Sequence, residues 1–243
     1  MKKTVIIVAG GKGLRMGGDL PKQFMPLRGK PVLMHTIEVF YRWDATVDLI
    51  SVIPEEHVSY WDMLCKELNF TIPHRTVYGG KTRFHSVCNA LQDCSESKGL
   101  IAVHDGVRPF VDWGVISSCF DAAESYGAAI PVIPVIESVR EVNGDESRPF
   151  DRNRLCIVQT PQVFHADILQ KAYEQPYDER FTDDASVVEA SGHPIRLVQG
   201  NRENIKITTP MDLKSPPLTP PQGRGNKYEL TKPSPLGGDG GGF

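Results

Sequence analysis

The sequence predicts an α/β protein with a Rossmann-like, mostly parallel sheet in three layers, helices covering both faces of the sheet. Three observations lead to this prediction. Short apolar runs rich in β-branched residues alternate with longer amphipathic segments along the first 135 residues. Strands that alternate with helices form parallel sheets, because each helix carries the chain back to the edge where it started. Glycine-rich or charged turns also follow several strands, at the edge where such sheets bind ligands.

The elements of the first half follow from apolar spacing and from residues that begin or end helices. Pro31 suits the first turn of a helix, Asp112 suits an N-cap, and Gly127 suits a helix end. We therefore expect strands at residues 4–9, 47–53, 75–78, 100–103 and 128–135, and helices at 31–43, 55–68, 83–93 and 113–126.

The pattern changes after residue 136. Residues 137–161 are strongly charged, have no helical period and contain the turn Asn143-Gly144-Asp145, which predicts a long hairpin or arm. Such an arm suits dimerisation, and a plain solvated hairpin is the alternative. Helices at 166–174 and 183–191, strands at 194–198 and 204–208 and the start of a helix at 210 follow. Residues 215–243 are dense in proline and glycine, so we expect a domain at 1–214 and a disordered tail.

Composition excludes several classes of protein. The net charge of −3 argues against a broad nucleic-acid-binding surface. No apolar run approaches the roughly 20 residues that span a bilayer, and the N-terminus leads into a strand without a signal-peptide pattern. The five cysteines are odd in number and have no CxxC spacing, which favours reduced thiols in a cytoplasmic protein over a disulfide framework or zinc site.

A glycine-rich, cationic loop follows the first strand at residues 10–18. Glycines let backbone N–H groups approach an anion, and Arg15 and Lys22 add positive charge nearby. The loop matches neither the P-loop nor the dinucleotide-binding pattern. Taken alone, it fits either a phosphate-binding loop or an ordinary surface turn.

Asp105 is the candidate metal ligand, because it ends an apolar strand at the edge where the glycine-rich loop lies. Mg²⁺ commonly uses one or two carboxylates together with phosphate oxygens, and a turn-capping role is the alternative. Arg108 follows within the same turn and could reach an anionic substrate. His104 is better suited to structural hydrogen bonding than to acid–base chemistry. Lys206 lies opposite Ile205 and Ile207 in an alternating segment, where a solvated edge lysine is the alternative.

These candidates combine cations, one carboxylate and a glycine loop, without a Ser-His-Asp set. Transfer of a phosphoryl or nucleotidyl group needs such residues, because the protein mainly positions anions and neutralises charge in the transition state. The residues alone therefore indicate a Mg²⁺-dependent enzyme that acts on a nucleotide.

Six segments in order resemble the 2-C-methyl-D-erythritol 4-phosphate cytidylyltransferase family, over about residues 4–213. They are AGGKGLRMGGDLPKQFMPLRGKPVL, GGKTRFHSV, VHDGVRPF, FDRNRL, QTPQVF and NIKITTPMDL. The resemblance implies a nucleotidyltransferase fold, a homodimer joined by the arm, and transfer of a cytidylyl group from CTP to 2-C-methyl-D-erythritol 4-phosphate in the non-mevalonate isoprenoid pathway.

The resemblance also implies roles for individual residues. Arg15, Lys22 and Lys206 would be catalytic cations at the α-phosphate, and Asp105 would hold Mg²⁺. Arg108 would bind the sugar phosphate, and the partner's arm would complete that site. The CTP site would comprise Ala9, Gly10, Gly11, Gly80, Ser86 and Gly106, and the arm would contribute Ser138, Arg152 and Thr160.

Two other functions fit the same sequence. Ribitol-5-phosphate cytidylyltransferases share almost the same glycine loop and the NIKITTP segment, and residues 151–153 in the arm favour methylerythritol phosphate. A non-catalytic nucleotide-binding module on the same fold is the second alternative, because a fold does not fix a function. The full set of Arg15, Lys22, Asp105 and Lys206 argues against it.

Overall fold

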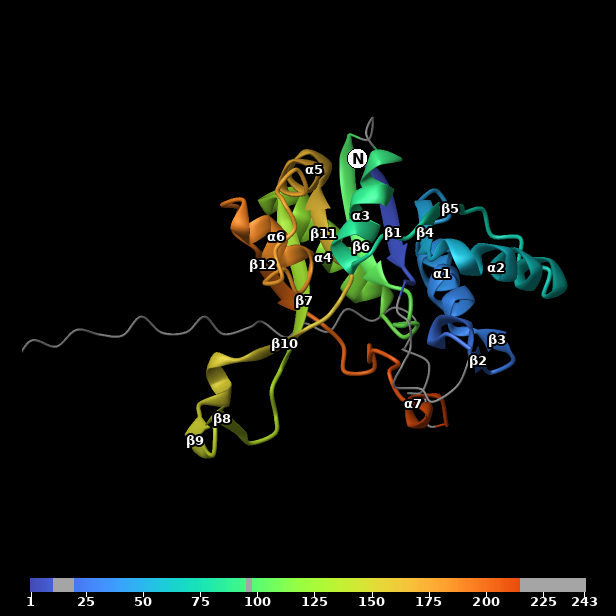
Figure 1. Ribbon diagram of the computed structural model, residues 1–243. Coiled ribbons are helices and arrows are strands. Elements are labelled where there is room, and N and C mark those ends of the chain that lie inside the picture. Colours follow the sequence, from blue (N-terminus) through green and yellow to red (C-terminus); the bar gives the residue numbers. More distant parts are fainter. Residues whose placement is uncertain (11–19, 95–97, 215–243) are drawn as a thin grey trace, which may run out of the picture.

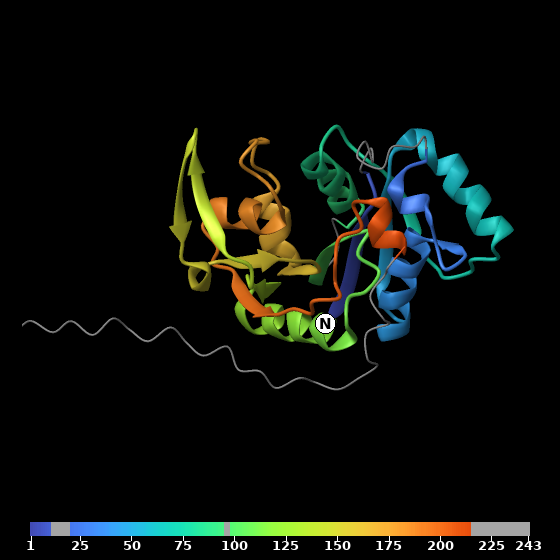
Figure 2. The same ribbon diagram turned by 90° about the horizontal axis from the view of Figure 1, so that it is seen from below.

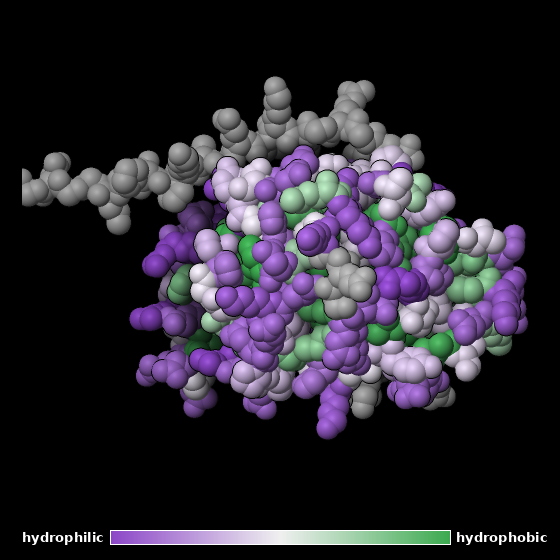
Figure 3. Space-filling model, turned by 90° about the horizontal axis from the view of Figure 1, so that it is seen from above, coloured by the Kyte–Doolittle hydropathy of each residue, from purple (hydrophilic) through white to green (hydrophobic). Residues whose placement is uncertain are grey.

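The computed structural model describes residues 1–10, 20–94 and 98–214. The predictions for Gly11, Arg15 and the tail 215–243 therefore fall outside the described residues. Within them, no helix is long and apolar enough to cross a membrane. Figure 3 shows a face on which polar side chains surround small separate areas of hydrophobic residues.

The centre of the described structure is a sheet in the order β10-β7-β11-β6-β1-β4-β5, with β12 on the other side of β7 (Figure 1). Pairings among β6, β1, β4 and β5 are parallel, as is that of β12 with β7, whereas β10 and β11 run antiparallel to their neighbours. The strands are β1 Lys2–Val8, β4 Asp48–Ile53, β5 Arg75–Tyr78, β6 Gly99–Asp105, β7 Ala128–Pro134, β10 Cys156–Val158, β11 Gln162–His165 and β12 Arg196–Gln199. The predicted, mostly parallel α/β sheet is confirmed, and β11 is an antiparallel strand that the sequence did not predict.

Helices cover both faces of this sheet. One buried cluster joins the sheet to α1, α2 and α4, and the other joins it to α3, α5 and α6. The longer helices are α1 Val32–Trp43, α2 Glu55–Glu67, α3 Arg83–Gln92 and α4 Trp113–Tyr126, and the shorter ones are α5 Ala166–Ala172, α6 Asp184–Ala190 and α7 Pro210–Lys214. A short 3-10 helix η2 (Lys22–Phe24) and the strand pair β2 (Pro26–Leu27) and β3 (Lys30–Pro31) connect β1 to α1.

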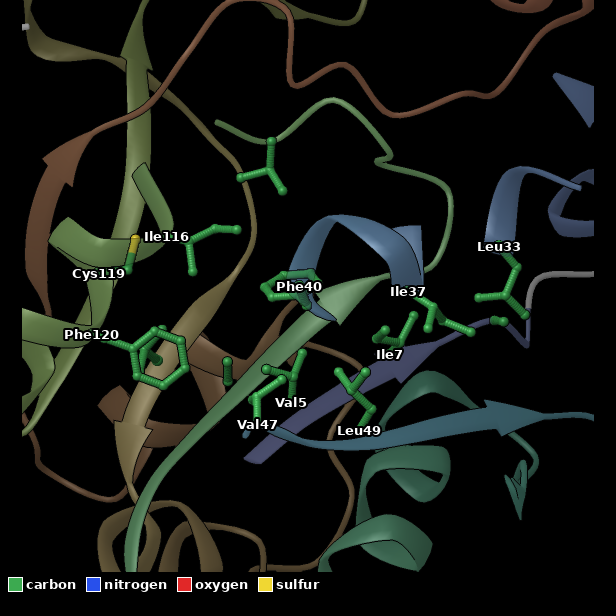
Figure 4. Packing of buried hydrophobic residues seen from close by; sticks show 14 of the residues in the cluster. Val5, Ile7, Leu33, Ile37, Phe40, Val47, Leu49, Ile116, Cys119 and Phe120 are labelled. Carbon is green, nitrogen blue, oxygen red and sulfur yellow. The ribbon is translucent and has the colours of Figure 1, made fainter. Parts of the chain in front are cut away.

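Alternation along β1 explains the three layers. Successive side chains of a strand point to opposite faces, so Val5 and Ile7 join the first cluster whereas Ile6 joins the second. Figure 4 shows Val5 and Ile7 packed toward Phe40 of α1. All of these side chains are fully buried, and burial of each apolar side chain contributes about 1.5–3 kcal/mol of transfer free energy.

The arm in the structure is shorter than the span of 137–161 that the sequence predicted. A two-stranded hairpin, β8 (Val139–Asn143) and β9 (Glu146–Phe150), projects away from the sheet (Figures 1 and 2). A 3-10 helix η3 (Arg152–Arg154) then leads into β10, which pairs with β7 in the main sheet. The last residues of the predicted arm therefore belong to the sheet, because their backbone groups bond to β7.

The strand predicted at residues 204–208 is absent from that described segment. The segment crosses the ends of the strands (Figure 2) instead of extending the sheet, and Ile207 N–H donates to the carbonyl of Val107 at 2.9 Å. The predicted alternation still holds in part, because Ile207 is fully buried and Lys206 is exposed.

Candidate active site

The carboxyl ends of neighbouring strands place the predicted turns around one pocket. β1 leads into Ala9 and Gly10, β5 into Gly79 and Gly80, and β6 ends at Asp105. The pocket has a volume of about 540 Å³, within the usual range for small-molecule sites. The predicted site residues that line it are Ala9, Gly10, Lys22, Gly80, Ser86, Asp105 and Lys206.

Asp105 lies at the centre of a charge cluster in this pocket. Its Oδ2 is 3.1 Å from both Lys206 Nζ and Arg108 Nε, and its Oδ1 is 3.9 Å from Arg83 Nε. Burial alone would raise the pKa of the Asp105 carboxyl, but the charges of these cations outweigh burial and hold the pKa well below its ordinary value. Asp105 is therefore an ionised carboxylate at neutral pH, with the Lys206 ammonium beside it.

A buried layer of hydrogen bonds fixes the Asp105 turn from beneath. Thr160 Oγ1 accepts the backbone N–H of Asp105 at 3.1 Å and lies 2.9 Å from His104 Nδ1. His104 Nε2 lies 3.0 Å from the carbonyl oxygen of Arg108. These partners assign the proton to Nε2, which donates to that carbonyl, while Nδ1 accepts from the Thr160 hydroxyl. Burial lowers the pKa of His104 to about 4, so the ring is neutral at pH 7.

The structure corrects the predicted placement of Thr160. Thr160 is 5% exposed, and its carbonyl accepts a hydrogen bond from Asn204 Nδ2 at 2.8 Å. It lies beneath the Asp105 turn of its own chain, because β10 has already brought the backbone into the sheet before residue 160. A contact between Thr160 and a sugar phosphate stays a prediction, but the arm does not carry this residue.

Arg108 is held by the same layer. Its Nη1 donates to the carbonyl of Asn204 at 2.8 Å while its Nε donates to Asp105, and its side chain is 12% exposed. Two of its five N–H groups are thus occupied by the protein. The remaining groups leave the predicted sugar-phosphate contact open.

The turn between β5 and α3 is shaped by Ser86. Its hydroxyl accepts the N–H of Gly80 at 3.0 Å and donates to the carbonyl of Thr82 at 3.0 Å. A Cβ on Gly80 would lie 2.4 Å from Cβ of His85, so only glycine fits there without displacement of α3. Gly80 and Ser86 therefore set the wall of the pocket, whatever each contributes to CTP binding.

Gly106 has a packing role of its own. Its N–H donates to the carbonyl of Val8 at 2.9 Å, and an added Cβ would lie 3.1 Å from both Ala9 Cβ and Leu33 Cδ1. The close approach of β1, α1 and the Asp105 turn thus requires a small residue.

Ser138 and Arg152 lie away from the pocket of their own chain. Both are exposed, and Arg152 Nη1 donates to the carbonyl of Ile136 within the connection to the hairpin. Neither residue lines the pocket. Their predicted role in a partner's site stays a prediction.

Comparison with known proteins identifies the family. The family model described as 2-C-methyl-D-erythritol 4-phosphate cytidylyltransferase matches residues 3–217. The chain belongs to this family. Relatives that carry the same name in Bacteroides thetaiotaomicron and Phocaeicola vulgatus are 55% and 56% identical over 214 residues, and each match covers 88% of this chain and 97% of the relative.

Solved structures of the cytidylyltransferase family share the fold. The 4-diphosphocytidyl-2C-methyl-D-erythritol synthase of Anaerococcus prevotii is 26% identical with a TM-score of 0.74, over 88% of this chain and 95% of that one. The 2-C-methyl-D-erythritol 4-phosphate cytidylyltransferase of Thermus thermophilus is 30% identical with a TM-score of 0.71, over 88% and 96%. The predicted family, nucleotidyltransferase fold and enzyme class are confirmed.

Arg83 at the pocket and its buried partner Asp184 are features that the sequence did not predict. Arg83 lines the pocket at the start of α3, and its Nη1 donates to Asp184 Oδ1 at 2.9 Å. Burial opposes the charge of Arg83, but Asp184 outweighs burial and raises the pKa of the guanidinium. A cation in the first turn of a helix is unfavourable beside the helix dipole, so the position of Arg83 at the start of α3 was a sequence signal for a special role. The position of its partner Asp184 could be found only from the fold.

The residues at the pocket fit a Mg²⁺ ion that is bound mainly by phosphate oxygens. Asp105 supplies one ionised carboxylate, and its Oδ1 has a more distant cation neighbour than its Oδ2. No group of three or more His, Cys, Asp or Glu side chains among the described residues could form a metal cage. One carboxylate is enough when phosphate oxygens of a nucleotide provide further ligands, which is a common way for proteins to bind Mg²⁺.

Proposed function

We propose that this chain transfers the cytidylyl group of CTP to 2-C-methyl-D-erythritol 4-phosphate, with release of pyrophosphate, in non-mevalonate isoprenoid biosynthesis. The observation that carries this proposal is the Asp105 cluster at a pocket lined by Gly10, Lys22 and Gly80, in a chain of the cytidylyltransferase family. A carboxylate surrounded by cations at the ends of parallel strands suits a triphosphate and its metal ion.

The reaction is a displacement at the α-phosphorus of CTP. A phosphate oxygen of the sugar phosphate forms the new P–O bond, and the bond between the α-phosphorus and the bridging oxygen breaks, so that pyrophosphate leaves with the electron pair. The attacking oxygen is already anionic and needs no general base. The work of the protein is therefore to align two anions and to stabilise the charge that develops.

The described side chains suit these tasks. Lys206 Nζ stands at the pocket wall with its side chain 41% exposed, so it can leave Asp105 to meet an α-phosphate oxygen. Lys22 is a second cation that lines the pocket, and we assign Arg15 to the same role by family membership. In this proposal Ala9, Gly10, Gly11, Gly80, Ser86 and Gly106 form the CTP site.

We assign Asp105 as the protein ligand of Mg²⁺. When bound, Mg²⁺ neutralises phosphate charge and polarises the phosphorus that is attacked. The low pKa of Asp105 supports this assignment, because the carboxylate is available without deprotonation at neutral pH. Arg108, held beside Asp105, is our candidate for the sugar phosphate, and Thr160 supports the Asp105 turn through its hydroxyl.

We further propose a homodimer in the cytoplasm, in which the hairpin of one chain supplies Ser138 and Arg152 to its partner. Exposed apolar side chains at Ile136, Val142 and Ile157 support this proposal, since they lie on or next to the hairpin and on β10. Exposed apolar side chains that gather in one region commonly mark an interface, and these three belong to neighbouring segments of the chain. The cysteines of the described residues are unpaired, as expected in a reducing compartment.

Pyrophosphate release tests the proposed function. The full chain is given CTP and Mg²⁺ with either 2-C-methyl-D-erythritol 4-phosphate or ribitol 5-phosphate, and pyrophosphate is measured with a coupled assay. We expect turnover with methylerythritol phosphate and at least about 100-fold less with ribitol 5-phosphate, because a site built for one hydroxyl pattern leaves polar groups unpaired with another. Turnover with ribitol 5-phosphate alone would overturn the assignment of the sugar substrate.

A further inference from the structure

Arg83 is the cation of the Asp105 cluster that has no role in the reaction described above. It stands at the first position of α3, lines the pocket, and keeps 28% of its side chain exposed. Its Nε lies 3.9 Å from Asp105 Oδ1. One edge of the guanidinium therefore faces the part of the pocket where the metal ligand lies.

The other edge of Arg83 is clamped by a buried carboxylate. Nη1 donates to Asp184 Oδ1 at 2.9 Å and Nη2 donates to Oδ2 at 2.5 Å. Asp184 is fully buried, and its Oδ1 also accepts from the hydroxyl of Tyr173 at 2.6 Å. A two-point contact of this kind fixes the plane of a guanidinium. The clamp therefore sets the direction of the Nε–H group, which the contact with Asp184 does not use.

Charge at this wall is not balanced within the described residues. Arg83, Arg108 and Lys206 surround Asp105, and Asp184 is the second carboxylate of the cluster. Three positive groups thus face two negative ones in this cluster. The rest of the pocket lining adds Lys22 and Lys81 against Glu55 and Glu56, so the excess of positive charge remains and attracts an anion. A buried ion pair adds little stability over apolar packing of the same volume, so a contribution to ligand binding gives this pair a physical reason.

We propose that Arg83 is a phosphate-binding residue for the triphosphate of the nucleotide, and that Asp184 is the positioning residue that holds it at the pocket wall. This inference rests on the proposed use of CTP. Arg83 contributes a directed N–H group and a full charge, whereas Asp184 acts only through Arg83. Arg suits the role because its planar fork binds a carboxylate with one edge and leaves the other for a phosphate oxygen.

Equilibrium binding of CTP and of CMP tests this inference. The full chain and the variants Arg83→Gln, Arg83→Lys and Asp184→Asn are titrated with each nucleotide by calorimetry, once with Mg²⁺ and once with a chelator. We expect Arg83→Gln to weaken CTP binding about 10- to 100-fold, the range for loss of a charged hydrogen bond, and to change CMP binding less than about threefold. Arg83→Lys and Asp184→Asn should lose CTP affinity in the same direction by smaller factors.

Arg75 and Asp48 provide the matched control pair. Nη2 of Arg75 on β5 lies 2.9 Å from Oδ2 of Asp48 on β4, and neither residue lines the pocket. Arg75→Gln and Asp48→Asn should leave the ratio of CTP to CMP affinity unchanged. Melting temperatures of all variants separate lost stability from lost binding, and Arg83→Lys keeps a charge beside Asp184 if Arg83→Gln does not fold.

Two outcomes would overturn the inference. Unchanged affinities for both CTP and CMP in folded Arg83 variants would mean that Arg83 only joins α3 to α6. An equal loss for CTP and CMP would mean that Arg83 acts on the nucleoside end of the ligand. Both are distinct from failure of the proposed function, in which the wild-type chain binds CTP but forms no pyrophosphate with the sugar phosphate.

Discussion

The buried ring of His104 makes a quantitative prediction about stability at mild acid pH. In the unfolded chain this imidazole takes up a proton near its ordinary pKa of 6.5, whereas burial lowers the pKa in the folded protein to about 4. Between these values the unfolded state binds more protons, so falling pH favours unfolding. The neutral ring is needed because Nδ1 must accept from Thr160 while Nε2 donates to the carbonyl of Arg108.

The magnitude follows from the two pKa values. From pH 7 to pH 5, His104 should remove about 2 kcal/mol from the free energy of unfolding. His104→Gln keeps a donor for the Arg108 carbonyl but cannot take up a proton. We expect this variant to be less stable than the wild type at pH 7 and to lose about 2 kcal/mol less between pH 7 and pH 5.

Urea unfolding at a series of pH values measures this difference. The free energy of unfolding is extrapolated to water for the wild type, for His104→Gln and for Val163→Ala, which removes buried apolar volume in β11 without removing a titrating group. Val163→Ala should be destabilised by a similar amount at all pH values. Parallel pH curves for the wild type and His104→Gln would refute the assigned tautomer and the buried neutral ring.

Three further predictions concern the pocket and the proposed dimer contact. Lys206→Ala should lower the rate of pyrophosphate release about 10²- to 10³-fold, the usual loss for one preorganised charge in a catalytic site; a wild-type rate in this variant would remove Lys206 from the mechanism. Gly80→Ala should cost about 1–3 kcal/mol of stability and weaken CTP binding, because its Cβ would lie 2.4 Å from a side-chain carbon of His85. Gly79→Ala is the control for that change, since its Cβ would meet its neighbours at 3.4 Å or more, and chemical unfolding with calorimetry compares the two. Ile157→Glu should shift the chain from dimer to monomer in sedimentation velocity, because a charge would replace an apolar side chain that is 46% exposed in the isolated chain; an unchanged sedimentation coefficient would place the dimer contact elsewhere.

The sequence determined the layers of the fold because its signals were local. The continuous run of β-branched apolar residues in β1 and the capping signals of Asp112 and Gly127 depend on neighbouring residues only. The structure confirms the N-cap, since Asp112 Oδ1 accepts the N–H of Gly114 at 2.7 Å. The family resemblance, carried by six segments in order, was likewise readable without coordinates.

The tertiary structure decided which distant residues meet. Antiparallel β11 was not predicted because it has only four residues and its sequence shows no clear alternation. Its place between β6 and β7 buries both of its faces, so no polar face marks it as a strand. The segment at 204–208 alternates like a strand, but it hydrogen-bonds to the Asp105 turn instead of to a sheet edge. Thr160 was placed in the arm from sequence because nothing local marks the return of β10 to the sheet.

The same distinction separates the predicted parts of the active site from those found only in the structure. The sequence by itself determined Asp105, Lys206 and the glycine turns as candidates, because strand ends and glycines are marked in the chain. Only the fold decided that Arg83 joins them, since its partner Asp184 is 101 residues away along the chain. A buried ion pair depends on which surfaces the packing of α3 and α6 brings together, and no local pattern of residues records that contact.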